Sequence, residues 1–198
     1  MSCPYALVLA AGQGARFGGR KLLSPWRGGV LLDGALAAAL AAPVEAVLLV
    51  TGADAAEVAA AGRDFAARLG QGGRLRIVTA RDYALGMAES LRAGLTALPA
   101  DASGVLVFLG DMPVVPPEIP DQLARALAVG APAAAPIHKG QRGNLVALSR
   151  VLFADLAVLN GDTGARGLLD GLGERLALVE TDSDGVLIDV DRPGEAPA

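Results

Sequence analysis

The chain has little from which to build a disulfide or a metal cage. Its 198 residues include one cysteine, Cys3, and one histidine, His138. A lone cysteine cannot form an intramolecular disulfide, and one Cys with one His falls short of a structural zinc ligand set. Disulfide-stapled and zinc-based folds are therefore excluded, and we expect the protein to work in the cytoplasm.

Aromatic residues are also scarce, at 4% of the chain, although 53% of the residues are hydrophobic. The core must therefore consist of closely packed Ala, Val and Leu side chains, which suits a layered α/β fold. No basic segment precedes the first apolar run, and no apolar stretch reaches about 18 residues, so we expect neither a signal peptide nor a membrane span. A formal net charge of −4 argues against a nucleic-acid-binding protein. The expected partner is a small molecule.

Short apolar runs alternate with longer helical patterns up to Gly130. Buried strands are predicted at residues 5–10, 46–51, 75–79 and 105–109, and helices at 31–41, 55–69, 87–98 and 117–129. Such a βαβα order predicts a mostly parallel sheet between two layers of helices, a Rossmann-like three-layer α/β/α fold. The length favours one domain over residues 1–198.

After Gly130 the pattern is less regular. Strands are predicted at residues 132–137, 144–148, 176–180 and 186–190, and helices at 151–159 and 165–172. His138 is expected in an exposed polar loop, where a histidine is more often neither base nor ligand.

The first predicted strand runs directly into residues 11–21, a stretch with four glycines and three cations. Glycines let backbone N–H groups approach an anion closely, and the cations neutralise its charge. A triphosphate is the predicted guest, with a simple tight turn as the alternative. A dinucleotide-binding fingerprint fails because Phe17 stands at its third glycine, and a Walker A loop fails because Lys21 lacks the required neighbours.

Asp111 follows the predicted strand 105–109 and should therefore lie at the carboxyl edge of the sheet, where open α/β folds bind ligands. Magnesium binds one or two protein carboxylates together with phosphate oxygens and water, so Asp111 is a candidate Mg²⁺ ligand. Asp189 and Asp191 lie at the end of the last predicted strand, and strand alternation places them on one face. One of them is expected to complete the magnesium site. A turn at Asp111 and a solvated strand end are the alternatives.

The glycine loop resembles the signature of the MobA-like nucleotidyltransferases, and within them of the molybdenum cofactor cytidylyltransferases. Leu-Ala-Ala-Gly at 9–12 is followed by Gly14, Arg16, Phe17 and Gly18 and by Lys-Leu-Leu at 21–23. This resemblance implies a nucleotide-binding loop made of Leu9, Ala10, Ala11, Gly12, Gly14, Arg16, Phe17, Gly18 and Lys21. It implies that Arg16 and the loop amides hold the β- and γ-phosphates and that Lys21 meets charge at the α-phosphate. Arg16, Lys21 and Asp111 then form the catalytic set.

Further segments resemble the same family. Gly86 to Ser90 is similar to a family helix start beside the nucleotide, where Ser90 would contact a base or ribose. Residues 140–146 resemble G-x-R-G-N-P-V, with a leucine in place of the proline, and offer Arg142 and Asn144 to the acceptor. Residues 161–166 resemble G-D-x-G-A-R, in which Asp162 either caps the next helix or joins Arg166 at the acceptor.

Over residues 7–193 the resemblance implies transfer of CMP from CTP to the terminal phosphate of molybdopterin or its molybdenum form, with Mg²⁺ as cofactor. Residues up to about 113 would bind the nucleotide and 114–193 the acceptor. Cytosine is favoured because guanylyl members tend to carry a second glycine where this chain has Ala11. A molybdoenzyme or its chaperone would receive the product, and no nucleic acid or membrane is involved.

Two other functions stay open. One is a guanylyl- or other MobA-like transferase that acts on a different phosphorylated acceptor. The other is an accessory protein that binds nucleotide or cofactor without turnover, which the presence of Lys21 and Asp111 disfavours.

Overall fold

The structure is a computed structural model that describes residues 3–159, 161 and 165–192, with only the backbone of Arg16. The central sheet consists of β1 (Tyr5–Ala10), β4 (Val47–Thr51), β5 (Leu75–Thr79), β6 (Gly104–Leu109), β7 (Ala133–His138), β8 (Gln141–Arg142), β9 (Val146–Ser149) and β10 (Leu176–Glu180). A separate hairpin joins β2 (Pro25–Trp26) and β3 (Gly29–Val30). The helices are α1 (Leu32–Ala41), α2 (Ala55–Arg68), α3 (Met87–Thr96), α4 (Ile119–Ala128), α5 (Phe153–Ala157) and α6 (Arg166–Leu172).

The strand order is β5-β4-β1-β6-β9-β7-β10, and β8 pairs with β7. β5, β4, β1 and β6 are parallel, β10 is parallel to β7, and β9 is antiparallel to both of its neighbours. The chain leaves β1 for β4 and β5 on one side and then crosses to β6 on the other. Ligands of open α/β sheets bind at such a switch point, outside the carboxyl ends of the strands.

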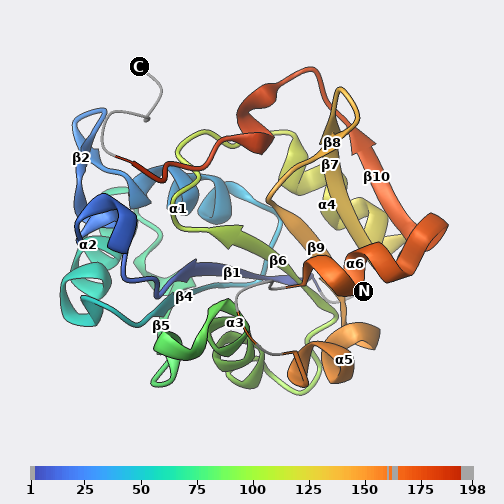
Figure 1. Cartoon of the computed structure of the whole chain (residues 1–198), viewed down its shortest axis with the longest axis horizontal. Helices are drawn as coiled ribbons and strands as arrows, with labels where there is room; N and C mark the ends of the chain where they lie inside the picture. Colours follow the sequence, from blue (N-terminus) through green and yellow to red (C-terminus); the bar gives the residue numbers. More distant parts are fainter. Residues whose placement is uncertain (1–2, 160, 162–164, 193–198) are drawn as a thin grey trace.

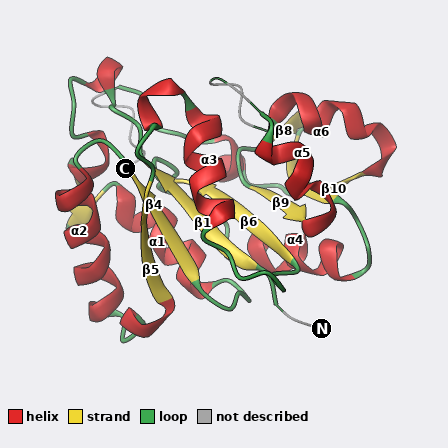
Figure 2. Ribbon diagram, turned by 90° about the horizontal axis from the view of Figure 1, so that it is seen from below, coloured by secondary structure: helices red, strands yellow, loops and turns green. Residues whose placement is uncertain are grey.

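Helices cover both faces of the sheet, because alternate residues of each central strand point to opposite sides. In β1, Ala6 and Val8 pack into one core with α1, α2 and α4, whereas Leu7 packs into a second core with α3, α5 and α6. Figure 1 shows α1 and α4 above the central strands β1 and β6, and α3 and α5 below them. In Figure 2, seen from below, α3 lies in front of the sheet. The expected single-domain three-layer α/β/α fold is confirmed.

The structure contains every helix predicted from the sequence and every predicted strand up to Glu180. The predicted strand at 186–190 is wrong: Asp184–Leu187 form a 3₁₀ turn, η7, and no strand follows among the described residues. The physical reason is that its backbone groups pair with loops. The Val186 carbonyl accepts from the amide of Asn144 at 3.0 Å, and the Val190 amide donates to the Asp111 carbonyl at 3.1 Å.

The expectation of an exposed His138 is also wrong. His138 is the last residue of β7, and its side chain is buried. Its Nδ1 lies 2.9 Å from the carbonyl oxygen of Thr181, just beyond the neighbouring strand β10. The polar residues that follow it, from Lys139 to Arg142, hid the strand end. None of the described helices has the length and apolar character needed to cross a membrane.

Two helical glycines differ in what surrounds them. A Cβ on Gly34, in α1, would stand 2.4 Å from the carbonyl oxygen of Pro113, whereas one on Gly167, in α6, would meet nothing within 4 Å. Gly34→Ala should destabilise the protein by about 1–3 kcal/mol, because the backbone beyond Asp111 must move. Gly167→Ala should stabilise it by about 0.5–1 kcal/mol. Urea unfolding measures the change in unfolding free energy for both variants. If both changes had the same sign, the close packing of α1 on the loop at Pro113 would be contradicted.

Candidate functional site

The glycine loop folds back on itself at the carboxyl end of β1. Gly14 has a left-handed backbone (φ 59°), and its carbonyl accepts from the amides of Phe17 at 2.9 Å and Gly19 at 3.1 Å. A Cβ on Gly14 would stand 2.9 Å from the Cβ of Lys21. Glycine is therefore required at this position, both for the backbone angle and for the close approach of Lys21. The turn returns Lys21 to the edge of the sheet where β1 and β6 end.

A cavity of about 370 Å³ lies at this edge. Of the predicted nucleotide-binding residues, those that line it are Leu9, Ala10, Ala11, Gly12, Gly14, Lys21, Gly86 and Ser90, together with Asp111. Phe17 and Gly18 do not line it. The side chain of Arg16 lies outside the described part of the chain.

The cavity also has residues that the sequence analysis did not assign, among them Tyr83 and Met87. Tyr83 follows β5 in a 3₁₀ turn at the same edge of the sheet. A Cβ on Gly52 would stand within 2.7 Å of both the Tyr83 side chain and the Ala11 Cβ, so glycine lets both pack against this position. The position of Tyr83 just after a parallel strand was a usable signal. Met87 lies inside the quoted family-like segment but received no role.

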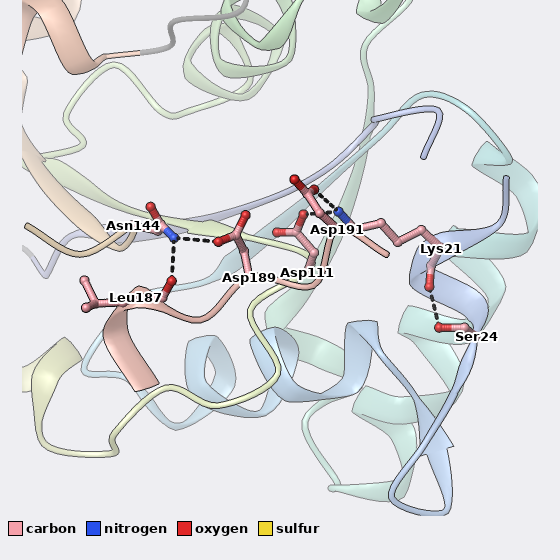
Figure 3. Close-up of polar contacts among 7 residues, drawn as sticks. All are labelled: Lys21, Ser24, Asp111, Asn144, Leu187, Asp189 and Asp191. Carbon is pink, nitrogen blue, oxygen red and sulfur yellow. Dashed lines mark hydrogen bonds and ion pairs between the residues drawn. The ribbon is translucent and has the colours of Figure 1, made fainter. Parts of the chain in front are cut away.

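Three carboxylates meet beside Lys21. Asp111, Asp189 and Asp191 each offer one oxygen, and these oxygens lie within 4.8 Å of one another. The Nζ atom of Lys21 lies 2.6 Å from Oδ2 of Asp111 and 3.1 Å from Oδ1 of Asp191. Figure 3 shows the three carboxylates gathered between the Lys21 ammonium group and the amide of Asn144. The structure thus brings the predicted metal set together, although not through strand alternation.

Hydrogen bonds from two loops hold the segment that carries Asp189 and Asp191. Beyond the bond from the Val190 amide to Asp111, the Nδ2 atom of Asn144 donates to Oδ1 of Asp189 at 3.3 Å and to the Leu187 carbonyl at 3.5 Å. These contacts hold an irregular segment in place without strand pairing. They also connect Asn144, a predicted acceptor residue, to the acidic cluster.

The charges of this cluster shift two pKa values. The cost of dehydrating the carboxylate and the negative charges of Asp111 and Asp191 raise the pKa of Asp189, with Lys21 opposing them. Burial lowers the pKa of Lys21, but its hydrogen bonds and charge interactions with Asp111 and Asp191 outweigh this and raise it. Among the described residues, Oδ1 of Asp111 is buried without a hydrogen-bond partner. Three carboxylates beside one lysine, one of them with an unsatisfied oxygen, fit a divalent cation.

A second cavity of about 560 Å³ adjoins the first, and the two share Leu9, Met87 and Leu109. The predicted acceptor residues Arg142, Asn144 and Arg166 line it. Arg142 also pairs with Asp170 of α6 at 2.7 Å. Asp162 lies outside the described residues. The remaining walls include apolar side chains of α3, β6 and β9, so this cavity combines an apolar surface with cationic groups.

A glycine loop at a sheet switch point, an acidic cluster beside it and two adjoining cavities are typical of nucleotidyltransferases. The chain belongs to the MobA-like NTP transferase family, because the sequence model of that family's domain matches residues 6–178. The resemblance inferred from the glycine loop is therefore confirmed.

Two relatives illustrate this membership. The molybdenum cofactor cytidylyltransferase of Escherichia coli K12 is 26% identical over 98% of this chain and 94% of that protein. The bifunctional protein GlmU of Kineococcus radiotolerans is 34% identical over 89% of this chain. The match covers 34% of GlmU, so the chain spans about a third of the length of that relative.

Solved structures agree with the fold. Rv0371c of Mycobacterium tuberculosis H37Rv has a TM-score of 0.80 at 26% identity, over 98% of this chain and 96% of that one. A structure of Rv0371c in complex with manganese has a TM-score of 0.76 over the same shares of the two chains.

The electrostatic arrangement predicts opposite effects for two substitutions. Asp191→Asn removes a negative charge and should lower the pKa of Asp189, whereas Lys21→Met removes a positive charge and should raise it further. A carboxyl ¹³C NMR titration in metal-free buffer measures both shifts. Shifts of the same sign would contradict the arrangement.

The same pKa shift affects stability. A carboxyl whose pKa is raised by folding contributes stability that is present below its unfolded pKa and is lost as pH rises through its folded pKa. The unfolding free energy of the wild type minus that of Asp189→Asn should therefore fall as pH rises from below the unfolded pKa of Asp189 to above its raised folded pKa.

Proposed function

We propose that this nucleotidyltransferase transfers CMP from CTP to the terminal phosphate of molybdopterin or its molybdenum form, with release of pyrophosphate. The observation that supports this best is the pair of adjoining cavities. One is walled by the glycine loop and Asp111, the other by Arg142, Asn144 and Arg166. The donor and the acceptor can then meet at the shared wall of Leu9, Met87 and Leu109.

On the donor side, the loop amides and Arg16 hold the β- and γ-phosphates, and Lys21 neutralises charge at the α-phosphate. Gly86 and Ser90 adjoin the nucleoside part of the cavity. Asp111 with Asp189 or Asp191 would hold Mg²⁺, which when bound supplies positive charge to the phosphate oxygens and helps to align them. Lys21 then moves its hydrogen bonds from carboxylate to phosphate oxygens.

On the acceptor side, Arg142 and Arg166 bind phosphate oxygens, because a guanidinium group offers a planar set of donors that matches them. Asn144 holds its place through Asp189 and the Leu187 carbonyl. The apolar walls receive the flat ring of the pterin. The likeness to the E. coli cytidylyltransferase over most of both chains supports this acceptor.

The reaction needs no covalent enzyme intermediate. An oxygen of the acceptor phosphate forms a bond to the α-phosphorus, the bond from that phosphorus to the bridging oxygen breaks, and its electron pair leaves with pyrophosphate. The enzyme contributes alignment and charge neutralisation. In this proposal, residues up to about 113 bind the nucleotide and residues 114–193 bind the acceptor. A molybdoenzyme or its chaperone receives the product.

The role of Asp111 has a direct test. Asp111→Asn keeps the shape of the side chain but removes its charge, so pyrophosphate release from CTP with Mg²⁺ and molybdopterin should fall at least about a hundredfold. Asp184→Asn, on the same C-terminal segment as Asp189 but outside the cluster, is the matched control and should stay near wild-type rates. An unchanged rate of pyrophosphate release in Asp111→Asn would contradict a catalytic role for Asp111. Tight CTP binding by the wild type without turnover on molybdopterin would favour an accessory protein.

The choice of base also has a test. Ala11 is buried and lines the first cavity, where its methyl group takes the space that a second glycine would leave. With Mg²⁺, CTP should raise the melting temperature more than GTP, ATP or UTP, because ligand binding to the native state stabilises it. Ala11→Gly should shift the preference toward GTP. A wild type stabilised best by GTP would overturn the cytidylyl assignment.

A further inference from the structure

Helix α3 contributes to both cavities. Gly86 and Ser90 line the first, Leu91 lines the second, and Met87 lines both. The side chain of Arg92, on the same helix, lines neither. It points instead to the carbonyls of Ala157, the last residue of α5, and of Leu159.

Arg92 makes three polar contacts, and two of them leave its own helix. Its Nε donates to the carbonyl of Ala157 at 2.8 Å, and its Nη2 donates to the carbonyl of Leu159 at 2.5 Å. Its Nη1 pairs with Glu89 one turn earlier, which fixes the plane of the guanidinium group. Carbonyls at the end of a helix such as α5 lack intrahelical partners, so Arg92 satisfies groups that would otherwise need water.

A backbone contact ties the same segment to the start of α3. The amide of Ala88 donates to the carbonyl of Gly161 at 3.1 Å, and the N-cap residue, Gly86, has no side chain with which to cap this end of the helix. The first amides of a helix need such an acceptor. Ala157, Leu159 and Gly161 are thus fastened to α3 at two levels, by Arg92 and by Ala88.

We propose that Arg92 is a positioning residue that couples the nucleotide cavity to the acceptor cavity through α3. By holding the carbonyls of Ala157 and Leu159 it fixes the end of α5, whose Leu156 shares an apolar cluster with Leu169 of α6, and so sets the place of Arg166 and Leu169 in the acceptor cavity. A residue that only stabilised α3 would need its ion pair with Glu89 and no contact outside the helix. The assignment of CTP to the first cavity and of the acceptor to the second rests on the proposed function, whereas the contacts of Arg92 do not.

Hydrogen–deuterium exchange tests the coupling without any acceptor. The variants are Arg92→Ala and Arg92→Lys, whose single ammonium group keeps the charge but not the planar fork. The matched control is Arg125→Ala, which breaks an exposed ion pair with Asp121 on α4. CTP with Mg²⁺ should slow exchange in peptides covering residues 153–159 and 166–172 of the wild type and of Arg125→Ala. Both Arg92 variants should exchange faster there and lose the protection by CTP.

Steady-state kinetics test the consequence. Loss of the two carbonyl contacts should raise the KM for molybdopterin about tenfold in Arg92→Lys, with kcat and the Kd for CTP within about twofold of the wild type. An unchanged KM, or an equal change in the Kd for CTP, would overturn the positioning role.

The two tests separate two kinds of failure. If the wild type does not use molybdopterin, the proposed function falls and the exchange data alone decide on Arg92. If exchange at residues 153–159 is the same in Arg92→Lys as in the wild type, the coupling is wrong whatever the acceptor is.

Discussion

The contact between the Lys21 ammonium group and the carboxylates of Asp111 and Asp191 joins the three parts of the chain that make the site. Lys21 comes from the glycine loop after β1, Asp111 from the end of β6, and Asp191 from the segment after η7. Without this cation, three carboxylates with oxygens within 4.8 Å of one another would repel each other in a crowded site. The glycine turn at Gly14, the crossover of the sheet and the irregular C-terminal segment all serve to bring these charges together.

The sheet provides the frame for that contact. Because the chain builds outward from β1 in both directions, the carboxyl ends of β1 and β6 lie side by side with different loops above them. The first cavity uses the loop after β1 and the start of α3, and the second uses β9 and α6. Residues of α3 line both cavities, so a displacement of this helix at one cavity would also change the other. Arg92 and Ala88 connect α3 to the carbonyls of Ala157, Leu159 and Gly161.

Local features carried much of the prediction. The apolar runs of β1, β4, β5 and β6 are short and bounded, so their periodicity and flanking residues identify them. The spacing of Gly14 and Lys21 likewise reflects local needs, namely a left-handed backbone at Gly14 and the close approach of Lys21 to it. Tertiary contacts decided the two errors. His138 is buried by β10, far away in sequence, and Asp189 reaches the cluster because Asn144 and the Asp111 backbone hold its segment.

The sequence by itself determined the layered α/β fold, the glycine loop and the membership of the chain in the MobA-like family, because each depends on patterns within a few turns of chain. Only the tertiary structure decided which charges meet. It placed Asp189 and Asp191 against Asp111 through an irregular segment, added Tyr83 and Met87 to the cavity at the glycine loop, and tied Arg92 to the carbonyls of Ala157 and Leu159. These contacts join residues distant in sequence, and their geometry follows from packing rather than from local propensity.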